Sequence, residues 1–166
     1  MNSNLTMDFS VNKENHTISV KREFAATLPL VWKAFTRSEI LDQWWAPSPW
    51  KAKTKAMDFT EGGQWLYTMI GPNGEEHWSF SKYLSIKNEK EFIATDGFSD
   101  SYGNINNEMP QSNWKVNFSN IEKNTLVEVE ITFNDLAQLE STLQMGFKEG
   151  FTMGLGNLDV YLAGHK

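Results

Sequence analysis

Residues 135–162 read DLAQLESTLQMGFKEGFTMGLGNLDVYL, and this stretch decides the fold. Its apolar residues recur at intervals of three and four, as they do on one face of an amphipathic helix. At 1.5 Å per residue the helix would be roughly 40 Å long, enough to cross a whole domain. We therefore predict one long C-terminal helix that lies across the rest of the molecule. Its apolar face consists of Leu139, Leu143, Phe147, Phe151, Leu155, Leu158 and Leu162.

Three glycines, Gly146, Gly150 and Gly154, follow the same helix at intervals of four. A glycine inside a helix costs roughly 0.5 to 1 kcal/mol relative to alanine, so three on one face call for a reason. Two interpretations stay open: a neighbouring element packs closely against the backbone there, or the glycines leave room for a bound molecule.

The chain before this helix alternates between apolar and polar residues in short runs, which is typical of an antiparallel sheet. In one run Trp65, Tyr67 and Met69 share a face; in the next we expect Trp78, Phe80 and Leu84 to face inward. Tight turns with paired glycines or Gly-Pro separate these runs. Strands are predicted over residues 16–24, 51–59, 64–70, 76–86, 91–95, 114–118 and 127–133.

Two short helices are predicted between the first two of these strands. The first begins after Thr27, with Pro29 in its first turn, and the second covers about residues 39–45 until two prolines end it. Residues 96–111 are rich in Gly, Asn, Asp and Ser and are expected to form a long loop. The predicted fold is α+β: a flexible lead of residues 1–15, then one domain over residues 16–166, with a curved antiparallel sheet of about six or seven strands, two short helices and the long helix over the sheet.

The composition of the chain argues against several classes of function. The 166 residues carry a net charge of −6 and scattered basic residues, which argues against nucleic acid as a partner. There is no cysteine, and the three histidines, at positions 16, 77 and 165, lack zinc-ligand spacing, so no metal or other cofactor is expected. The sequence has no signal-peptide pattern and no apolar run long enough for membrane insertion, which predicts a cytoplasmic protein.

Three motifs in this order resemble one known family. The first is PLVWKAFT at residues 29–36 followed by LDQWWAP at 41–47, and the second is MDFTEGGQW at 57–65 followed by GPNGEE at 71–76. The third is Gly150-Phe151 with Leu155, Leu158, Tyr161 and Leu162, in which Phe151 stands where the family usually has Trp. The chain resembles the START-like (SRPBCC) superfamily and, within it, the family named after the C-terminal domain of the activator of heat-shock-protein ATPase.

This resemblance implies a helix-grip fold, similar to that of Bet v 1, with a pocket between the sheet and the terminal helix for a small apolar molecule. Apolar and aromatic side chains suit such a wall, and the chain has seven Trp and eleven Phe. The alternative is that these aromatic residues simply fill the interior. We expect the wall to contain Trp50, Trp65, Tyr67, Trp78, Phe80, Trp114, Phe118, Phe147, Phe151 and Leu155.

Two other functions stay open beside ligand binding. Some relatives are polyketide cyclases or dehydratases, but the titratable candidates here are few: His77, Tyr67, Glu76 and Asp96, with His77 expected on the solvent side opposite Trp78. We therefore assign no catalytic residue. A stress-related, co-chaperone-like module would need an exposed apolar patch for a protein partner or a second copy of the chain. Residues 99–111 are interpreted either as a lid over the pocket or as a plain surface loop.

Overall fold

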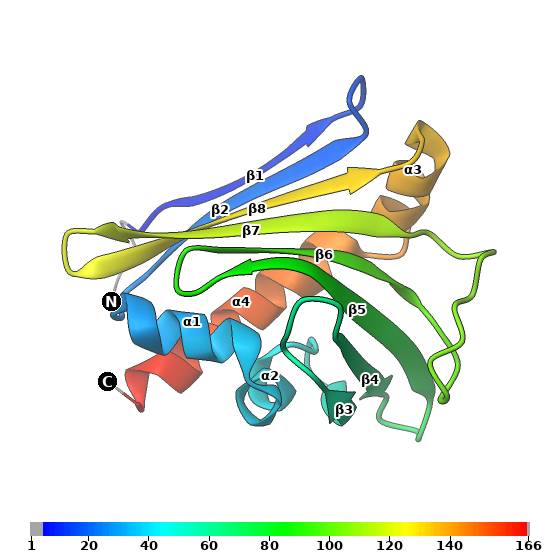
Figure 1. Ribbon diagram of the computed structural model, residues 1–166, viewed down its shortest axis with the longest axis horizontal. Helices are drawn as coiled ribbons and strands as arrows, with labels where there is room; N and C mark the ends of the chain where they lie inside the picture. The colour runs from blue at the N-terminus through cyan, green and yellow to red at the C-terminus, as the bar shows by residue number, and fades with distance from the viewer. Residues whose placement is uncertain (1–4, 166) are drawn as a thin grey trace.

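The computed structural model describes residues 5–165 and forms one eight-stranded antiparallel sheet with four helices (Figure 1). The strand order is β1-β2-β8-β7-β6-β5-β4-β3. The family resemblance predicted this α+β arrangement, although the sheet has more strands than expected. The elements are β1 (Met7–Asn12), β2 (Thr17–Phe24), α1 (Leu28–Thr36), α2 (Ser38–Trp44), β3 (Lys51–Met57), β4 (Gln64–Ile70), β5 (Glu76–Lys87), β6 (Glu91–Phe98), β7 (Ser112–Ile121), β8 (Asn124–Phe133), α3 (Leu136–Gln144) and α4 (Phe147–Ala163).

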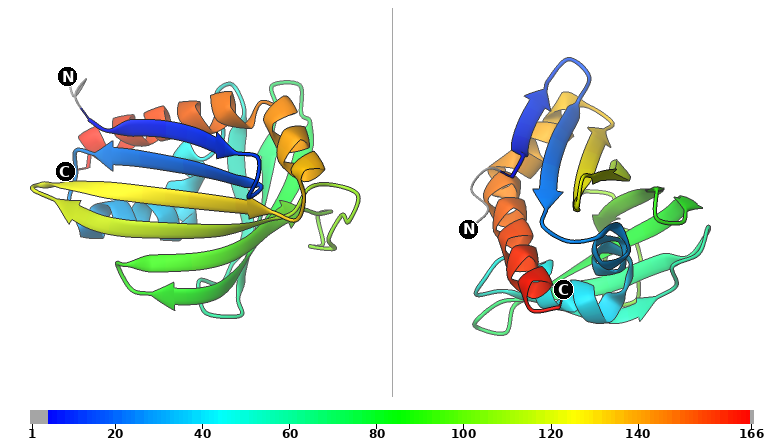
Figure 2. Two further views of the ribbon diagram at one scale, coloured as in Figure 1. Left: turned by 90° about the horizontal axis from the view of Figure 1, so that it is seen from above. Right: turned by 90° about the vertical axis from the view of Figure 1, so that its left-hand side faces the viewer.

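The sheet curves, and the helices α1, α2 and α4 lie on its concave side (Figures 1 and 2). On β7 and β8 the alternation predicted from the sequence is confirmed: Val116 and Phe118 are buried, as are Val129 and Ile131 on the neighbouring strand. These side chains meet Leu155 and Leu158 of α4 in one core. The alternating residues therefore position the sheet face against which the helix packs.

The first strand, β1, was not predicted, and the flexible lead expected before residue 16 is wrong over residues 7–12. These residues pair with β2 in regular register, from Met7 opposite Arg22 to Asn12 opposite Thr17. The strand lies at the sheet edge and most of its residues are exposed, so its sequence shows little apolar alternation. Phe9 is the exception: it packs against Phe147 at a ring distance of 6.3 Å. Residues 1–4 of the expected lead lie outside the described residues.

The single long C-terminal helix is also wrong, because the chain breaks between α3 and α4. Helix α3 does begin as expected: the Asp135 side chain accepts a hydrogen bond from the Gln138 N–H at 2.9 Å. At the break Gly146 adopts a φ of +88°, a left-handed conformation that favours glycine. Period counting alone does not detect this break, since the apolar residues keep the same spacing on both sides of it.

Helices α1 and α2 pack against each other, and Pro47 and Pro49 follow shortly after α2. The indole N–H of Trp44 donates to the Ala34 carbonyl at 2.9 Å, which fixes α2 against α1. The Asn157 side-chain amide of α4 donates to the carbonyl of Ala46, the residue before Pro47, at 3.1 Å. These bonds hold Trp45, the residue after α2, between the sheet and α4.

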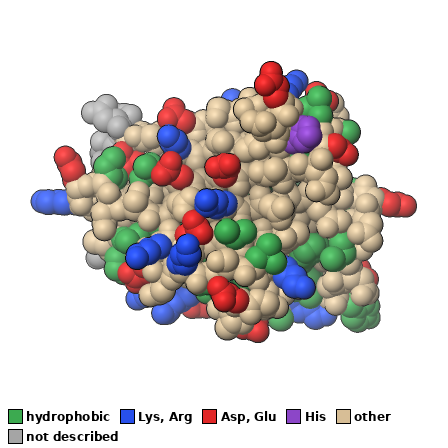
Figure 3. Space-filling view, turned by 45° about the horizontal axis from the view of Figure 1, so that its top comes forward, with side chains coloured by type: hydrophobic (Ala, Val, Ile, Leu, Met, Phe, Trp, Pro, Cys, Tyr) green, Lys and Arg blue, Asp and Glu red, His purple; other side chains and the backbone are tan. Residues whose placement is uncertain are grey.

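The surface is mixed in character on the face shown in Figure 3. Acidic and basic side chains are interspersed there, and apolar side chains show as small separate groups between them. This face therefore presents neither a single-sign charge field nor an extended apolar patch.

Candidate functional site

A cavity of about 510 Å³ lies between the concave face of the sheet and the helices, at the end of the molecule where α3 lies. Strands β4 to β8 form one wall, and the segment from Thr142 to Phe151 forms the opposite wall. Trp45 and Pro47 close it from the side of α2. The helix break contributes directly, because Met145 and Gly146 belong to the lining. The lining is mostly apolar, as is usual for small-molecule sites.

The structure brings five of the ten predicted wall residues to this cavity. Phe147 and Phe151 come from the first turns of α4, where their rings stack at 5.2 Å. Trp114 on β7 packs edge-on against both phenyl rings. The cavity residues among the ten are Tyr67, Phe80, Trp114, Phe147 and Phe151.

The other five predicted residues lie elsewhere. Phe118 and Leu155 are buried in the closed core, with Phe118 packed on Trp32 at 4.9 Å. Trp65 is buried beside the cavity and stacks on Tyr67 at 3.9 Å. Trp50 packs against His77 at a ring distance of 4.9 Å and does not line the cavity. The fifth, Trp78, lies on the opposite side of the sheet.

The orientation predicted for β5 is reversed. His77 and Ser79 pair with Met69 and Tyr67, so they share the concave face with these residues and line the cavity. Trp78 and Phe80 pair with Thr68 and Leu66 on the convex face, and Phe80 reaches the cavity only at its boundary, beside Gly97. Tyr83 continues the concave alternation of His77, Ser79 and Ser81 and is buried, and a bulge between Tyr83 and Ser85 leaves Leu84 51% exposed. His77 borders the cavity and is exposed to solvent, as expected, but it lies on the concave side of the sheet.

The reversal follows from where residues 99–111 lie. This loop covers the convex face: Lys55 Nζ donates to the Ser101 carbonyl at 2.6 Å, and Gly103 lies against Leu66. Leu66 and Phe80 are therefore buried on the convex face as well, so apolar residues do not mark the concave face alone. Within the loop only Pro110 lines the cavity, so most of it is not placed as a lid.

Two aromatic residues carry a polar contact at the centre of the site. The indole N–H of Trp45 donates to the Tyr67 hydroxyl at 3.0 Å, and the Trp45 ring contacts Trp65, Trp114 and Phe151. Burial, followed by the nearby charge of Asp96, raises the pKa of Tyr67 above its ordinary value. The Tyr67 hydroxyl therefore stays protonated over the physiological range.

Asp96, on β6, is the acidic residue of the lining. Its Oδ1 is inaccessible to solvent and is the one such side-chain atom without a hydrogen-bond partner in the part of the chain that the structure describes. Burial raises the pKa of Asp96 from 3.8 to about 7, and hydrogen bonding by Ser81, its partner across the two strands, opposes the shift. A carboxyl group with this pKa changes its charge near neutral pH.

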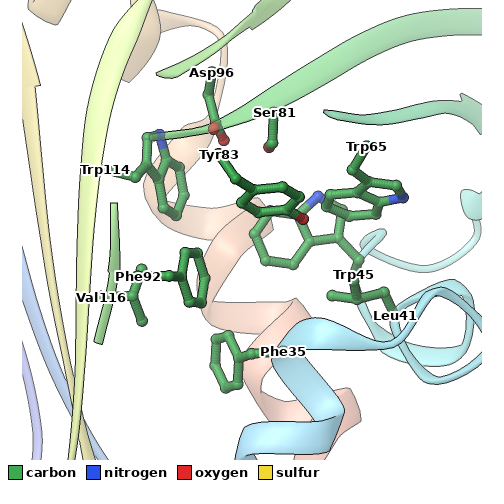
Figure 4. A pocket seen from close by; sticks show the side chains of 10 residues that line it. All are labelled: Phe35, Leu41, Trp45, Trp65, Ser81, Tyr83, Phe92, Asp96, Trp114 and Val116. Carbon is green, nitrogen blue, oxygen red and sulfur yellow. The ribbon is translucent and has the colours of Figure 1, made fainter. Parts of the chain in front are cut away.

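A second, much smaller void lies deeper than the cavity, and Asp96, Trp45 and Trp114 border both spaces. It has a volume of about 20 Å³, which is room for roughly one water molecule and too little for an organic ligand. Figure 4 shows Asp96 and Ser81 pointing into it from neighbouring strands, between the rings of Trp114 and Trp65. Asp96 therefore forms the inner, polar end of the larger cavity.

Sequence reasoning missed several lining residues for identifiable reasons. Asp96 was named as a titratable candidate but not as a wall residue, because it was assigned to the loop after a short predicted strand, although β6 continues to Phe98. Trp45 was treated only as part of a family motif. A signal for Asp96 did exist: residues 92, 94 and 96 continue one period-two pattern, which would have placed its side chain on the concave face.

Two other features, a metal site and a membrane-spanning helix, were sought among the described residues. No group of three or more His, Cys, Asp or Glu within residues 5–165 is arranged to hold a metal ion. In the same part of the chain no helix has both the length and the apolar character needed to cross a membrane.

Comparison with known proteins identifies the family of the chain. Residues 25–163 match the family described as "Activator of Hsp90 ATPase homolog 1-like protein". The chain belongs to this family. The resemblance inferred from the sequence motifs is therefore confirmed, and the match covers all elements from α1 to α4.

Solved structures similar to this Activator of Hsp90 ATPase homolog 1-like chain come from several bacteria. Protein Ms6760 from Mycobacterium smegmatis is 26% identical, with a TM-score of 0.87 over 95% of this chain and 96% of that one. A protein from Arthrobacter aurescens is 26% identical, with a TM-score of 0.88 over 94% and 91%. A protein from Staphylococcus epidermidis, 24% identical with a TM-score of 0.82 over 95% of both chains, shows the shared fold. A search of the curated proteins found no significant match.

Proposed function

We propose that this chain binds a small, largely apolar molecule in the cavity between the sheet and α4. The observation that carries the proposal is the cavity itself, which has a volume of about 510 Å³. Its walls are aromatic and apolar, with Asp96, Ser79 and the Tyr67 hydroxyl as its inner polar groups, and this composition is usual for sites that bind small organic molecules. The aromatic residues thus both fill the core and leave a space at one end.

Asp96 favours one second candidate, a cyclase-like enzyme. A carboxyl group with a pKa near 7 inside a cavity is suited to general acid–base catalysis. Tyr67 accepts a hydrogen bond from Trp45 and keeps its own hydroxyl proton to donate, but catalysis would also need a substrate held with its reacting atom against Asp96. Binding requires only the cavity, so it remains the primary proposal.

Gly150 provides a direct test. A Cβ at this position would meet only Pro47, at 3.6 Å, and both residues line the cavity, so a Gly150→Leu side chain would occupy the space. Gly156 lies two turns further along α4, outside the lining, and a Cβ there meets nothing within 4 Å. Gly156→Leu is therefore the matched control, because both changes replace a helical glycine with the same side chain.

The measurement is the binding of a neutral apolar dye such as Nile red, followed by its fluorescence. We expect one binding site in the wild type and in Gly156→Leu, and at least about tenfold weaker binding in Gly150→Leu, because its side chain excludes the dye. The absence of binding to the wild type, or equal binding by the two variants, would contradict the proposal.

A further inference from the structure

The inner end of the cavity points to a chemical class of ligand, an inference that rests on the proposed function. Asp96 Oδ1 lies at this end, shielded from solvent and without a hydrogen-bond partner among the described residues. A buried acceptor without a donor is costly, so natural proteins usually provide one. Asp96 borders the cavity, and rotation of its carboxyl group brings Oδ1 from the enclosed side to the cavity side, where a donor on the bound molecule can meet it.

The charges of the lining exclude one large class of apolar ligands. Neither Lys nor Arg lines the cavity or the small void, and Asp96 is the acidic residue of both. A ligand carboxylate, such as that of a fatty acid, would meet Asp96 with no arginine or lysine to offset the repulsion. The net charge of −6 on the chain adds to this preference against anions.

The aromatic side chains favour the opposite charge. Trp45, Trp114 and Tyr67 line the cavity together with Asp96, and Trp45 and Trp114 border the small void beside it as well. The faces of such rings attract ammonium groups, and the attraction is strongest for Trp and in places shielded from water. We propose that the ligand is an apolar amine, whose protonated nitrogen pairs with the Asp96 carboxylate among these aromatic rings.

The pairing predicts a dependence on pH. An alkylammonium group keeps its proton to about pH 10, as the lysine side chain does, whereas Asp96, with a pKa of about 7, loses its charge as the pH falls below neutral. Amine binding should therefore be strongest near pH 8 and weaken toward pH 5.

Other titratable groups near Asp96 come from two strands. Tyr67 on β4 and Tyr83 on β5 border it, and burial raises the pKa of both hydroxyls, so neither becomes charged between pH 5 and 8. His77 on β5 also lines the cavity. The lining residues from α2, α3, α4, β7 and β8 include no acidic or basic side chain.

The experiment compares three probes with the same chain length: n-octylamine, n-octanol and octanoate. Their binding to the wild type and to Asp96→Asn is measured by titration calorimetry at pH 8 and pH 5. At pH 8 we expect the wild type to bind n-octylamine roughly 10- to 100-fold more tightly than n-octanol, the gain typical of a hydrogen bond to a charged group. Octanoate should bind most weakly. Asp96→Asn should bind n-octanol as the wild type does and lose the preference for the amine.

Each outcome separates this inference from the proposed function. Equal binding of n-octylamine and n-octanol to the wild type, or an amine preference that survives in Asp96→Asn, overturns the inference but leaves a cavity that binds apolar molecules. Failure of all three probes overturns both. The substitution Asp8→Asn, at an exposed position on β1, should keep the amine preference.

Discussion

Among single residues, Asp96 is the one whose ionisation acts against folding. Its carboxyl is shielded in the folded protein, where its pKa is about 7, whereas in the unfolded chain it returns to about 3.8. Between these two values the folded state holds a proton that the unfolded chain has released. The free energy of unfolding therefore decreases as the pH rises from about 4 to 7, with no further loss above that range. Ionised Asp96 therefore lowers the stability of the fold at neutral pH.

The substitution Asp96→Asn should remove this loss. At pH 8 we expect the variant to be more stable than the wild type by up to about 4 kcal/mol, because the amide is neutral at every pH. At pH 5 the difference should shrink to about 2 kcal/mol, because the folded Asp96 is then protonated while the unfolded carboxyl is still mostly ionised. Urea unfolding at the two pH values measures the difference, and Asp8→Asn is the control. A gain in stability of the same size at both pH values would show that Asp96 does not titrate as inferred.

At the scale of elements, the three glycines spaced four residues apart turn out to have three different roles. Gly146 ends the α3 segment with a positive φ and allows α4 to start in a new direction. Gly150 borders the cavity and leaves space there. Gly154 lets α4 approach α2 closely, because a Cβ would lie 3.2 Å from the Trp45 carbonyl oxygen and 3.3 Å from that of Trp44. Close packing against the backbone is therefore confirmed at Gly154, whereas Gly150 borders the open space of the cavity.

Alanine substitutions in α4 distinguish these roles. Gly150→Ala should raise the free energy of unfolding by about 0.5 to 1 kcal/mol, since alanine favours the helix and its methyl group meets only Pro47. Gly154→Ala should lower it by about 1 kcal/mol, because the methyl group presses on two backbone carbonyls that cannot rotate away. Urea unfolding measures both, with Gly156→Ala as a control that should behave like Gly150→Ala. If Gly154→Ala were as stable as Gly150→Ala, close packing there would be refuted.

In the molecule as a whole, the sheet is open, and the helices connect its two edges across the concave side. Its two edges are formed by β1 and β3. Near one edge Arg22 of β2 pairs with Asp159 of α4, and Arg22 also donates to the Glu23 carbonyl at 2.6 Å. Near the other edge Thr54 of β3 donates to Asp42 of α2 at 2.6 Å. Because α2 and α4 also contact each other through Asn157, the edges are connected through the helices.

Loss of the ion pair between β2 and α4 should therefore lower the free energy of unfolding of the whole domain. The Arg22 side chain is only 14% exposed, so Asp159→Asn leaves a largely buried cation without its acid and should cost about 1 kcal/mol. The matched control is Glu140→Gln, which breaks the pair between Lys13 and Glu140, 61% and 44% exposed, and should cost less than about 0.5 kcal/mol. Thermal unfolding compares the two. Equal losses would mean that the Arg22 pair contributes no more than a surface contact.

The sequence by itself determined the features that depend on local patterns. Alternation placed β4, β7 and β8, spacing placed the apolar residues of α4, and short motifs identified the family. The tertiary structure decided what depends on distant neighbours: β1 pairs although it shows little apolar alternation, and α4 separates from α3 at Gly146. The loop covers part of the convex face, on which Trp78 lies, and the strand register places His77 and Asp96 on the concave face with the cavity. An apolar side chain gains free energy when it is buried on either face of a sheet. Which face is covered depends on where the other elements pack, and that is settled only in the complete fold.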